Sequence, residues 1–494
     1  MGPFTLSLSR LPVNTITNFL TGVVRETMTL HATDGTRLEM CLYRPYEVDM
    51  GRPDVIPCIV VVCCGQSLGD WAEVMYLYAT HGFAVVAFTG RPHVKLNDMF
   101  TPAEIQDLSD VHRFVRSQLQ WIRSDAMFLL GQSYASGIVL RCLALTGMAL
   151  YRGGIVLSPI PFVSSLVSED IGSIPVVSQA SVQMIQRQLG VQSVASQQFT
   201  SPSTPSDLRA QRILVIDQAE RAAFVPSNIT VPLYVHVNIG DSVVNIHDTV
   251  TLFALLAPTQ PRSCIRYVHG DHGISETAVS TRRAIYDDVL QWCRAILHDG
   301  SIKTYQTEVR STATGTSTVS AINPASDALK YTITDNKKLV CATTYYLPVL
   351  LVDRILQHLV HTYIPLRPLL RLHRDIIWSR VFTRSLDIAG FPVVSLLVHT
   401  TTPASGFGLT LLEYDRTGRG KRLSYKYILV PDTPPGSVPA VRVCIRMSMV
   451  SARLQCGQEL VLVVSNYDSR FAYTGRTDAT IEFTEITLPY LFEF

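Results

Sequence analysis

One stretch of the sequence decides the fold: Asp125-Ala-Met-Phe-Leu-Leu-Gly-Gln-Ser-Tyr-Ala-Ser-Gly-Ile-Val-Leu-Arg-Cys-Leu-Ala-Leu145. It begins with an apolar run of strand length, passes through a Gly-Gln-Ser-Tyr turn, and ends with apolar residues at helical spacing. A strand, a tight turn carrying a serine, and a helix form the pattern of a nucleophile elbow, which exposes the Ser133 hydroxyl at the tip of a sheet. The N-terminus of the helix would offer N–H groups to a developing oxyanion. The alternative is an ordinary strand–helix turn of any α/β protein.

A second serine, Ser67, fits the usual motif more closely. Gly65-Gln-Ser-Leu-Gly69 matches G-x-S-x-G letter for letter, whereas the elbow at Ser133 lacks the second glycine. Position in the chain decides between them, because the nucleophile of an α/β-hydrolase follows the third βα unit, while the loop after the first supplies an oxyanion N–H. Ser67 follows the first unit and Ser133 the third. We therefore predict Ser133 as the nucleophile and the N–H groups of Gln66 and Tyr134 as the oxyanion hole.

Composition limits the class of protein. A chain of 494 residues is too long for one core, so at least two domains are expected. The net charge is +2 and no block of like charges stands out, which argues against a nucleic-acid partner. The ten cysteines form no C-x-x-C pair, which favours reduced thiols over a disulfide framework or a zinc site. We see no signal peptide and no apolar window of about 18 residues, and therefore expect a cytoplasmic protein without a membrane span.

After an N-terminal hairpin around Asp34-Gly35, apolar runs alternate with amphipathic segments. This alternation is typical of a parallel sheet built from right-handed βαβ units. We assign 1–160 and 229–300 to this α/β domain. Strands are expected at 59–64, 83–88, 128–130, 154–157, 231–237 and 264–268, and helices at 71–80, 101–121, 249–256 and 282–297.

Residues 160–228 interrupt the alternation. They are rich in Ser, Gln, Val and Pro, with a flexible spot at Ser201-Pro-Ser-Thr-Pro205. Because they stand between the nucleophile and the acid in sequence, we predict a cap over the pocket. A surface excursion without a role is the alternative.

Two strand ends further along the chain carry an acid and a histidine. Asp241 and His272 each follow a predicted strand, so that Ser133, Asp241 and His272 stand in the Ser…Asp…His order of the α/β-hydrolase fold. Asp248 is the rival acid, although capping of a helix would explain it. His269 is the rival base and lies nearer to its strand.

These three side chains predict the chemistry of a serine hydrolase. His272 would take the Ser133 proton and return it to the leaving group, and Asp241 would fix the tautomer of the ring. Each oxyanion donor contributes roughly 3 kcal/mol to stabilising the transition state. The mechanism requires no metal and no organic cofactor.

The last third of the chain changes character. Residues 301–375 combine a Ser/Thr-rich stretch, 304–326, with a Leu-rich stretch, 345–372, and predict a linker and inter-domain segment. From 376 to 494 the apolar period becomes two, which predicts a β-sandwich of short strands separated by turn signals. These strands are expected at 381–386, 393–399, 408–414, 424–429, 441–447 and 460–465.

Several motifs in both halves match those of a known family: Asp34-Gly-Thr-Arg-Leu38, Gly131-Gln-Ser-Tyr134, Leu386-Asp-Ile-Ala-Gly-Phe-Pro-Val-Val394 and Cys456-Gly-Gln-Glu-Leu460. With them the chain resembles the cocaine esterase and X-prolyl dipeptidyl-peptidase family. The resemblance implies an α/β-hydrolase domain with an inserted cap and a C-terminal jelly roll. It also implies that Ser133, Asp241 and His272 form the triad.

The chain departs from this family at three points. Ser136 stands where the family elbow usually has glycine, and Gly65-Gln66 stands where family members often have a tyrosine as oxyanion donor. We find no separate N-terminal domain of the sort that binds the free amine of a dipeptide. That favours ester or simple amide substrates over dipeptidyl-peptidase activity.

Three functions therefore stay open. The first is hydrolysis of a small-molecule ester or amide, short peptides and X-Pro dipeptides included. The second is acyl transfer to another alcohol or amine on the same triad. The third is a non-catalytic binding protein that keeps the pocket. The oligomeric state is open as well, a homo-oligomer included.

Overall fold

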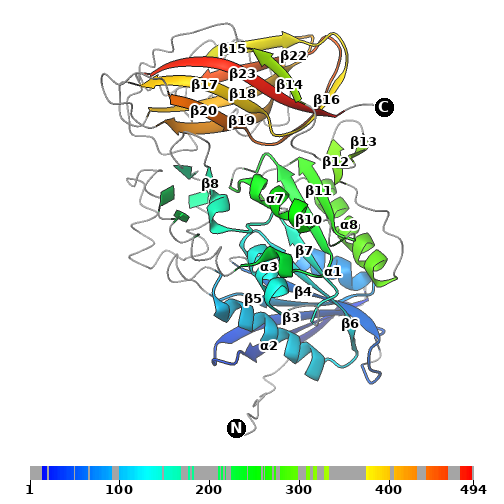
Figure 1. The fold of residues 1–494 in the computed structure, drawn as a ribbon. Coiled ribbons are helices and arrows are strands. Elements are labelled where there is room, and N and C mark those ends of the chain that lie inside the picture. Colours follow the sequence, from blue (N-terminus) through cyan, green and yellow to red (C-terminus); the bar gives the residue numbers. More distant parts are fainter. Residues whose placement is uncertain are drawn as a thin grey trace.

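The computed structural model shows an α/β domain followed by a β-sandwich (Figure 1). It describes residues 14–18, 22–48, 50–64, 67–91, 100–146, 150–168, 176–177, 181–182, 210–211, 213–214, 217, 224–241, 243–256, 260, 262–269, 272–273, 279–298, 307–311, 315–319, 328–332, 374–400, 405–430, 441–465 and 479–491.

The α/β domain is built on an 11-stranded sheet in the order β1-β2-β3-β5-β4-β6-β7-β10-β11-β12-β13. The run from β5 to β12 is parallel, and antiparallel strands form the two edges. The central strands are buried on both faces, as their continuous Val and Ile runs predict. The strands are β1 (Asn14–Asn18), β2 (Val23–His31), β3 (Arg37–Pro45), β4 (Ile56–Cys63), β5 (Ala84–Thr89), β6 (Ile122–Gln132), β7 (Gly153–Leu157), β10 (Leu233–Ile239), β11 (Cys264–His269), β12 (Thr307–Ser311) and β13 (Gly315–Val319).

Helices cover both faces of this sheet. α1 (Ala72–Thr80) and α8 (Val279–Leu297) share one apolar core, and α2 (Pro102–Gln118), α3 (Tyr134–Thr146) and α7 (Ile246–Leu256) share the other. The described part of the 160–228 segment contains η3 (Val163–Leu166), β8 (Val167–Ser168), β9 (Val176–Val177) and η4 (Pro226–Asn228).

The C-terminal β-sandwich consists of two antiparallel sheets. One has the order β20-β17-β23-β16-β21, with β14 also on β23, and the other has the order β15-β22-β18-β19. Their facing side chains form one core, which includes Val394, Phe407, Leu462 and Ile486. The strands are β14 (Ala328–Thr332), β15 (Arg374–Val381), β16 (Leu386–Gly390), β17 (Val393–Thr400), β18 (Ser405–Tyr414), β19 (Gly420–Val430), β20 (Val441–Arg446), β21 (Val450–Leu454), β22 (Glu459–Ser465) and β23 (Ala479–Leu491).

The fold class predicted from the sequence is confirmed, with local corrections. The strand expected at 381–386 is wrong, because β15 ends at Val381 and β16 begins at Leu386. The segment 301–375 is not all linker, because β12 and β13 extend the large sheet and β14 joins the sandwich. Backbone pairing to existing sheet edges needs no apolar periodicity, which explains why the Ser/Thr-rich sequence concealed these strands. The Leu-rich stretch 345–372 lies outside the described residues.

The sandwich packs on the α/β domain close to the end of β10 (Figure 1). The ring of Phe391, between β16 and β17, meets the ring of His247 on α7 edge-on at 5.6 Å. Met449, just before β21, is fully buried within the apolar core of the α/β domain. The two domains therefore share packed side chains beside the loop that links β10 to α7.

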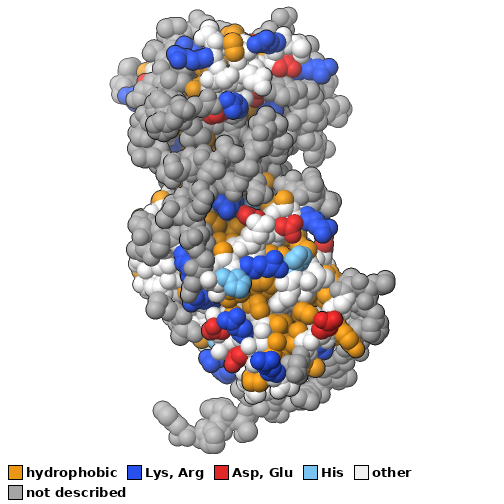
Figure 2. All heavy atoms as spheres, turned by 90° about the vertical axis from the view of Figure 1, so that its right-hand side faces the viewer, with side chains coloured by type: hydrophobic (Ala, Val, Ile, Leu, Met, Phe, Trp, Pro, Cys, Tyr) orange, Lys and Arg blue, Asp and Glu red, His pale blue; other side chains and the backbone are white. Residues whose placement is uncertain are grey.

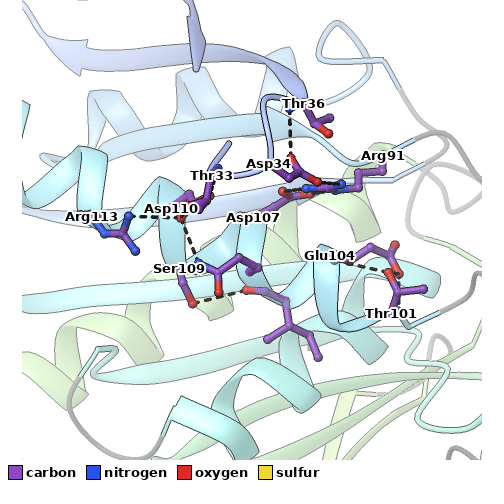
Figure 3. A network of polar contacts seen from close by, with 12 residues as sticks. Thr33, Asp34, Thr36, Arg91, Thr101, Glu104, Asp107, Ser109, Asp110 and Arg113 are labelled. Carbon is purple, nitrogen blue, oxygen red and sulfur yellow. Dashed lines mark hydrogen bonds and ion pairs between the residues drawn. The ribbon is translucent and has the colours of Figure 1, made fainter. Parts of the chain in front are cut away.

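Charged groups tie the N-terminal hairpin to helix α2 (Figure 3). Arg91 donates two hydrogen bonds of 2.6 Å to Asp107 of α2 and also contacts Asp34 in the hairpin turn. One turn further along α2, Asp110 accepts hydrogen bonds from Thr33. The hydrogen bonds and the Arg91 charge hold the pKa of Asp34 well below its usual value. The N-terminal hairpin is thus fixed to α2.

The described surface carries mixed charge. On the face shown in Figure 2, cationic and anionic side chains lie interspersed among apolar ones. Within the described residues no helix combines the length and apolar character that crossing a membrane requires. No group of three or more His, Cys, Asp or Glu side chains in this part of the chain is arranged to hold a metal ion.

His112 on α2 is a buried histidine whose ring packs edge-on against Tyr151, with centroids 5.2 Å apart. Among the described residues, neither ring nitrogen has a hydrogen-bond partner. Burial lowers the pKa of His112 to about 4. The folded protein therefore keeps this ring neutral at pH values where the unfolded chain binds a proton.

We predict that this difference makes stability depend on pH. The contribution of His112 to stability is fully present above about pH 6.5, the pKa of histidine in the unfolded chain. It is lost as the pH falls towards about 4, the pKa in the folded protein. For His112 alone the loss between pH 7 and pH 5 is about 2 kcal/mol. The variant His112→Phe keeps the ring contact with Tyr151 but cannot bind a proton. Between pH 7 and pH 5 its free energy of unfolding should therefore fall by about 2 kcal/mol less than that of the wild type. Urea denaturation followed by fluorescence measures both. Equal pH dependence in both proteins would contradict the prediction.

Candidate active site

The turn between β6 and α3 holds Ser133 in a left-handed conformation, with φ of 54°. The turn is too tight for a side chain at Gly131, where a Cβ atom would lie 2.6 Å from the carbonyl oxygen of Ala135. The Ser133 N–H donates to the carbonyl of Leu157 at 2.8 Å, which binds the tip of the turn to the neighbouring strand β7. This is the strained strand–turn–helix geometry of a nucleophile elbow.

The structure brings Ser133, His272 and Asp241 together. Ser133 Oγ lies 2.7 Å from His272 Nε2, and His272 Nδ1 lies 2.8 Å from Asp241 Oδ2. Because a carboxylate only accepts hydrogen bonds, Nδ1 carries the ring proton, which leaves Nε2 of a neutral ring to accept from the Ser133 hydroxyl. The Asp241 side chain is 1% exposed and that of His272 13%.

Backbone N–H groups hold the acid in place. Asp241 Oδ1 accepts hydrogen bonds from Val243 N and Val244 N, each 2.9 Å long. Its other oxygen is thereby left to face the histidine. The rival acid, Asp248, lies in the first turn of α7 and accepts a hydrogen bond from the Ser165 hydroxyl.

The rival serine is engaged elsewhere. Ser67 Oγ donates to Asp70 at 3.0 Å, and the backbone N–H of Asp70 donates back to Ser67, in an exposed turn before α1. Of His269, the structure describes only the backbone position at the end of β11.

The predicted oxyanion donors stay predictions. Tyr134 is the first residue of α3, so its N–H lies in the first turn of the helix. Gly65 and Gln66 lie outside the described residues.

Two polar residues that sequence reasoning missed connect the strand ends below the three side chains. Asn238 near the end of β10 is fully buried, and its Nδ2 donates to Ser158 Oγ at 2.9 Å and to the carbonyl of Gly273 at 3.5 Å. Ser158 follows β7 and also has a left-handed backbone, with φ of 46°. The bridge reaches the residue next to His272. The signal in the sequence was a polar residue inside an otherwise apolar strand end.

The glycine-to-serine departure at position 136 has a structural reason. Ser136 is fully buried, and its hydroxyl donates to the carbonyl of Ser133 while accepting from the backbone N–H of Ile160 at 3.2 Å. Within the described part of the chain, the Ile160 N–H otherwise reaches only the Ser133 carbonyl, at 3.4 Å. The side chain therefore joins the elbow to the chain that leaves β7.

Both ends of the 160–228 segment contact helix α3. Buried Arg141 donates to the carbonyl of Pro161 at 3.1 Å, and its guanidinium lies over the ring of Phe224 at 5.0 Å. Phe224 in turn packs against Phe162, with ring centroids 5.7 Å apart. The start and the end of the predicted cap thus meet behind the elbow, while most of its middle lies outside the described residues.

Comparison of the sequence with known proteins gives no relative. No protein-family profile matches the chain, and no curated protein matches it.

Comparison of the structure gives full-length neighbours. An aminopeptidase from a marine sediment Thaumarchaeota archaeon has a TM-score of 0.69 at 12% identity, and covers 99% of this chain and 100% of its own. An α-amino acid ester hydrolase has a TM-score of 0.65 at 13% identity with the same coverage. A CocE/NonD family hydrolase from Staphylococcus aureus has a TM-score of 0.63 at 13% identity, and covers 95% of this chain and 94% of its own. The fold implied by the family resemblance is confirmed over both domains.

We predict that the Ser136 hydroxyl stabilises the fold. Ser136→Ala and Ser136→Gly each deprive the buried N–H of Ile160 of its shorter hydrogen bond, which should cost about 1–3 kcal/mol in the free energy of unfolding. Urea denaturation measures the loss. Ser117→Ala is the control, because Ser117 is an exposed serine that bonds only within α2, and should change stability by less than about 0.5 kcal/mol. Wild-type stability in both Ser136 variants would contradict this role.

Proposed function

We propose that the protein is a serine hydrolase that cleaves an ester or amide acyl bond, with Ser133, His272 and Asp241 as its catalytic residues. The observation that carries the proposal is the unbroken hydrogen-bonded chain from the hydroxyl through the imidazole to the buried carboxylate. Three residues far apart in sequence, which follow β6, β10 and β11, meet at one edge of the sheet in the Ser–Asp–His order. A structural role for such a chain would not require its hydroxyl to sit on a strained turn.

The acylation half of the reaction follows from this geometry. Ser133 Oγ attacks the carbonyl carbon of the substrate while its proton passes to His272 Nε2. The carbonyl oxygen becomes an oxyanion, which the N–H groups of Tyr134 and Gln66 would bind. Collapse of this intermediate breaks the bond to the alcohol or amine, which leaves with the proton held by His272. Asp241 keeps the ring in the required tautomer and stabilises its charged form.

In the deacylation half, water replaces the leaving group. His272 takes a proton from water, the resulting hydroxide attacks the acyl-serine, and collapse returns the proton to Ser133 and releases a carboxylic acid. If another alcohol or amine took the place of water, the same residues would carry out acyl transfer.

The full-length structural neighbours support the proposed substrate class. They are an aminopeptidase, an α-amino acid ester hydrolase and a CocE/NonD family hydrolase. An aminopeptidase and an ester hydrolase cleave an acyl group from an amine and from an alcohol, respectively. We extend to this chain the common element, a small ester or amide.

We predict that a fluorophosphonate probe labels the wild-type protein and that Ser133→Ala abolishes both labelling and ester turnover. Loss of the nucleophile lowers kcat by about 10⁴-fold to 10⁶-fold. The matched control is Ser67→Ala, since Ser67 lies in the literal G-x-S-x-G motif but bonds only to Asp70. Labelling of Ser133→Ala together with loss of labelling in Ser67→Ala would assign the nucleophile to the other serine.

Side-by-side assays of p-nitrophenyl esters and X-Pro-p-nitroanilides test the substrate class. We expect turnover of esters without release of X-Pro dipeptides. Turnover of the X-Pro anilides would establish a dipeptidyl-peptidase instead. A transferred acyl product in the presence of an added alcohol or amine would indicate acyl transfer. If the wild type is neither labelled nor turns over any of these substrates, the protein is a non-catalytic binding protein.

A further inference from the structure

A buried carboxylate lies directly behind the nucleophile. Glu104 of α2 is 4% exposed, and its two oxygens lie 3.1 and 3.0 Å from the phenol oxygen of Tyr134, which is fully buried. Since a carboxylate accepts, the phenol donates the bond. Tyr134 is the residue after Ser133, so this bond joins the elbow to a second helix.

Both partners of this bond have a second anchor. Glu104 accepts a hydrogen bond of 2.8 Å from Thr101 N, as part of the capping box at the start of α2. The Tyr134 phenol oxygen accepts a hydrogen bond of 2.6 Å from the backbone N–H of Phe100. Phe100 has a left-handed backbone, with φ of 55°. The phenol therefore uses its donor and an acceptor position at once, which fixes its direction.

Aromatic packing prevents the phenol from moving aside. The ring of Phe100 stacks on that of Tyr134, with centroids 4.6 Å apart and planes inclined by 15°. The Arg141 guanidinium lies 3.8 Å from the centroid of Phe100. A Cβ atom at position 137 would lie 2.4 Å from the Phe100 ring, so only glycine fits there.

We propose that Glu104 is a positioning residue of the active site, which acts through the Tyr134 phenol to fix the peptide N–H that follows the nucleophile. This inference rests on the proposed serine hydrolase function and extends it to a residue outside the triad. The same N–H is the predicted oxyanion donor, and an error of about 1 Å in its placement can cost about 100-fold in rate.

The chemistry of the pair suits this role better than that of a cap alone. A capping box needs only the bond between Glu104 and Thr101, which an exposed side chain supplies equally well. Here the carboxyl group is buried, and burial raises its pKa to about 7. Burial also raises the pKa of the Tyr134 phenol well above its usual value, so the phenol keeps the proton that it donates.

The test compares four variants by kcat per labelled active site and by KM for a p-nitrophenyl ester. Glu104→Leu and Tyr134→Phe should each lower kcat about 10-fold to 100-fold with little change in KM, because the binding surface is intact. Glu104→Gln keeps acceptors for Thr101 and Tyr134 and should stay within about threefold of wild type. The double variant Glu104→Leu with Tyr134→Phe should lose no more than the worse single variant, because both remove one interaction.

The matched control is Asp107→Asn. Asp107 is the next buried carboxylate along α2, but it pairs with Arg91 on the hairpin side and should leave kcat unchanged. Wild-type kcat in Glu104→Leu and Tyr134→Phe, or a loss in Asp107→Asn as large as that in Glu104→Leu, would overturn the proposal. Tyr134→Phe preserves the ring packing and provides the test if Glu104→Leu fails to fold.

Amide hydrogen exchange of the peptide 131–140 measures how firmly the elbow backbone is held, and this measurement does not depend on catalytic activity. Exchange should be faster in Glu104→Leu and Tyr134→Phe, and unchanged in Asp107→Asn. If the wild type neither turns over esters nor reacts with the probe, the proposed function fails, and exchange alone decides whether Glu104 holds the elbow. Unchanged exchange in both variants would then overturn the proposal.

Discussion

The left-handed backbone of Ser133 is the constraint on which the rest of the site depends. A residue other than glycine loses roughly 1–2 kcal/mol in this conformation, so the turn persists only if its surroundings hold it. Three features supply that restraint: the absence of a side chain at Gly131, the hydrogen bond to the Leu157 carbonyl and the hydroxyl of Ser136. The strain lifts one hydroxyl clear of the sheet, where no regular strand or helix could place it.

Parallel pairing then determines which residues can meet that hydroxyl. β7, β10 and β11 follow β6 in the sheet and run in the same direction, so the chain leaves all four at the same edge. Asp241 and His272 come from the loops after β10 and β11 and reach the elbow across that edge. Asn238 and Ser158 bind the same strand ends together from below. A shift of one residue in any of these strands would turn its side chains to the opposite face.

The sequence sufficed where the structure follows from periodicity and chain order. Apolar runs identified the parallel strands, and order along the chain separated Ser133 from the literal motif at Ser67. Prediction from the sequence failed where the role of a residue depends on neighbours that are distant in sequence. From the sequence, Ser136 was only a departure from a family pattern. Its hydrogen-bond partner Ile160 lies 24 residues further along the chain, just after β7. Glu104 could be assigned from sequence only as part of a helix cap, because its bond to Tyr134 crosses between two helices. β12 and β13 were missed because pairing with a sheet edge left no apolar pattern.

Several fully buried polar groups contact the elbow. Burying an amide, hydroxyl or carboxyl group stabilises a protein less than burying an apolar side chain of similar size, unless every polar atom is paired. Yet Glu104, Ser136, Ser158 and Asn238 are all at least 96% buried, and each bonds to the backbone or a side chain at the edge of the sheet that carries Ser133. Leucine or alanine at these positions would remove the hydrogen bonds that the Ile160 N–H and the Tyr134 phenol donate to them. Directional bonds together with close packing can hold a group to within fractions of an ångström, and accurate placement of the Ser133 hydroxyl requires such bonds around it.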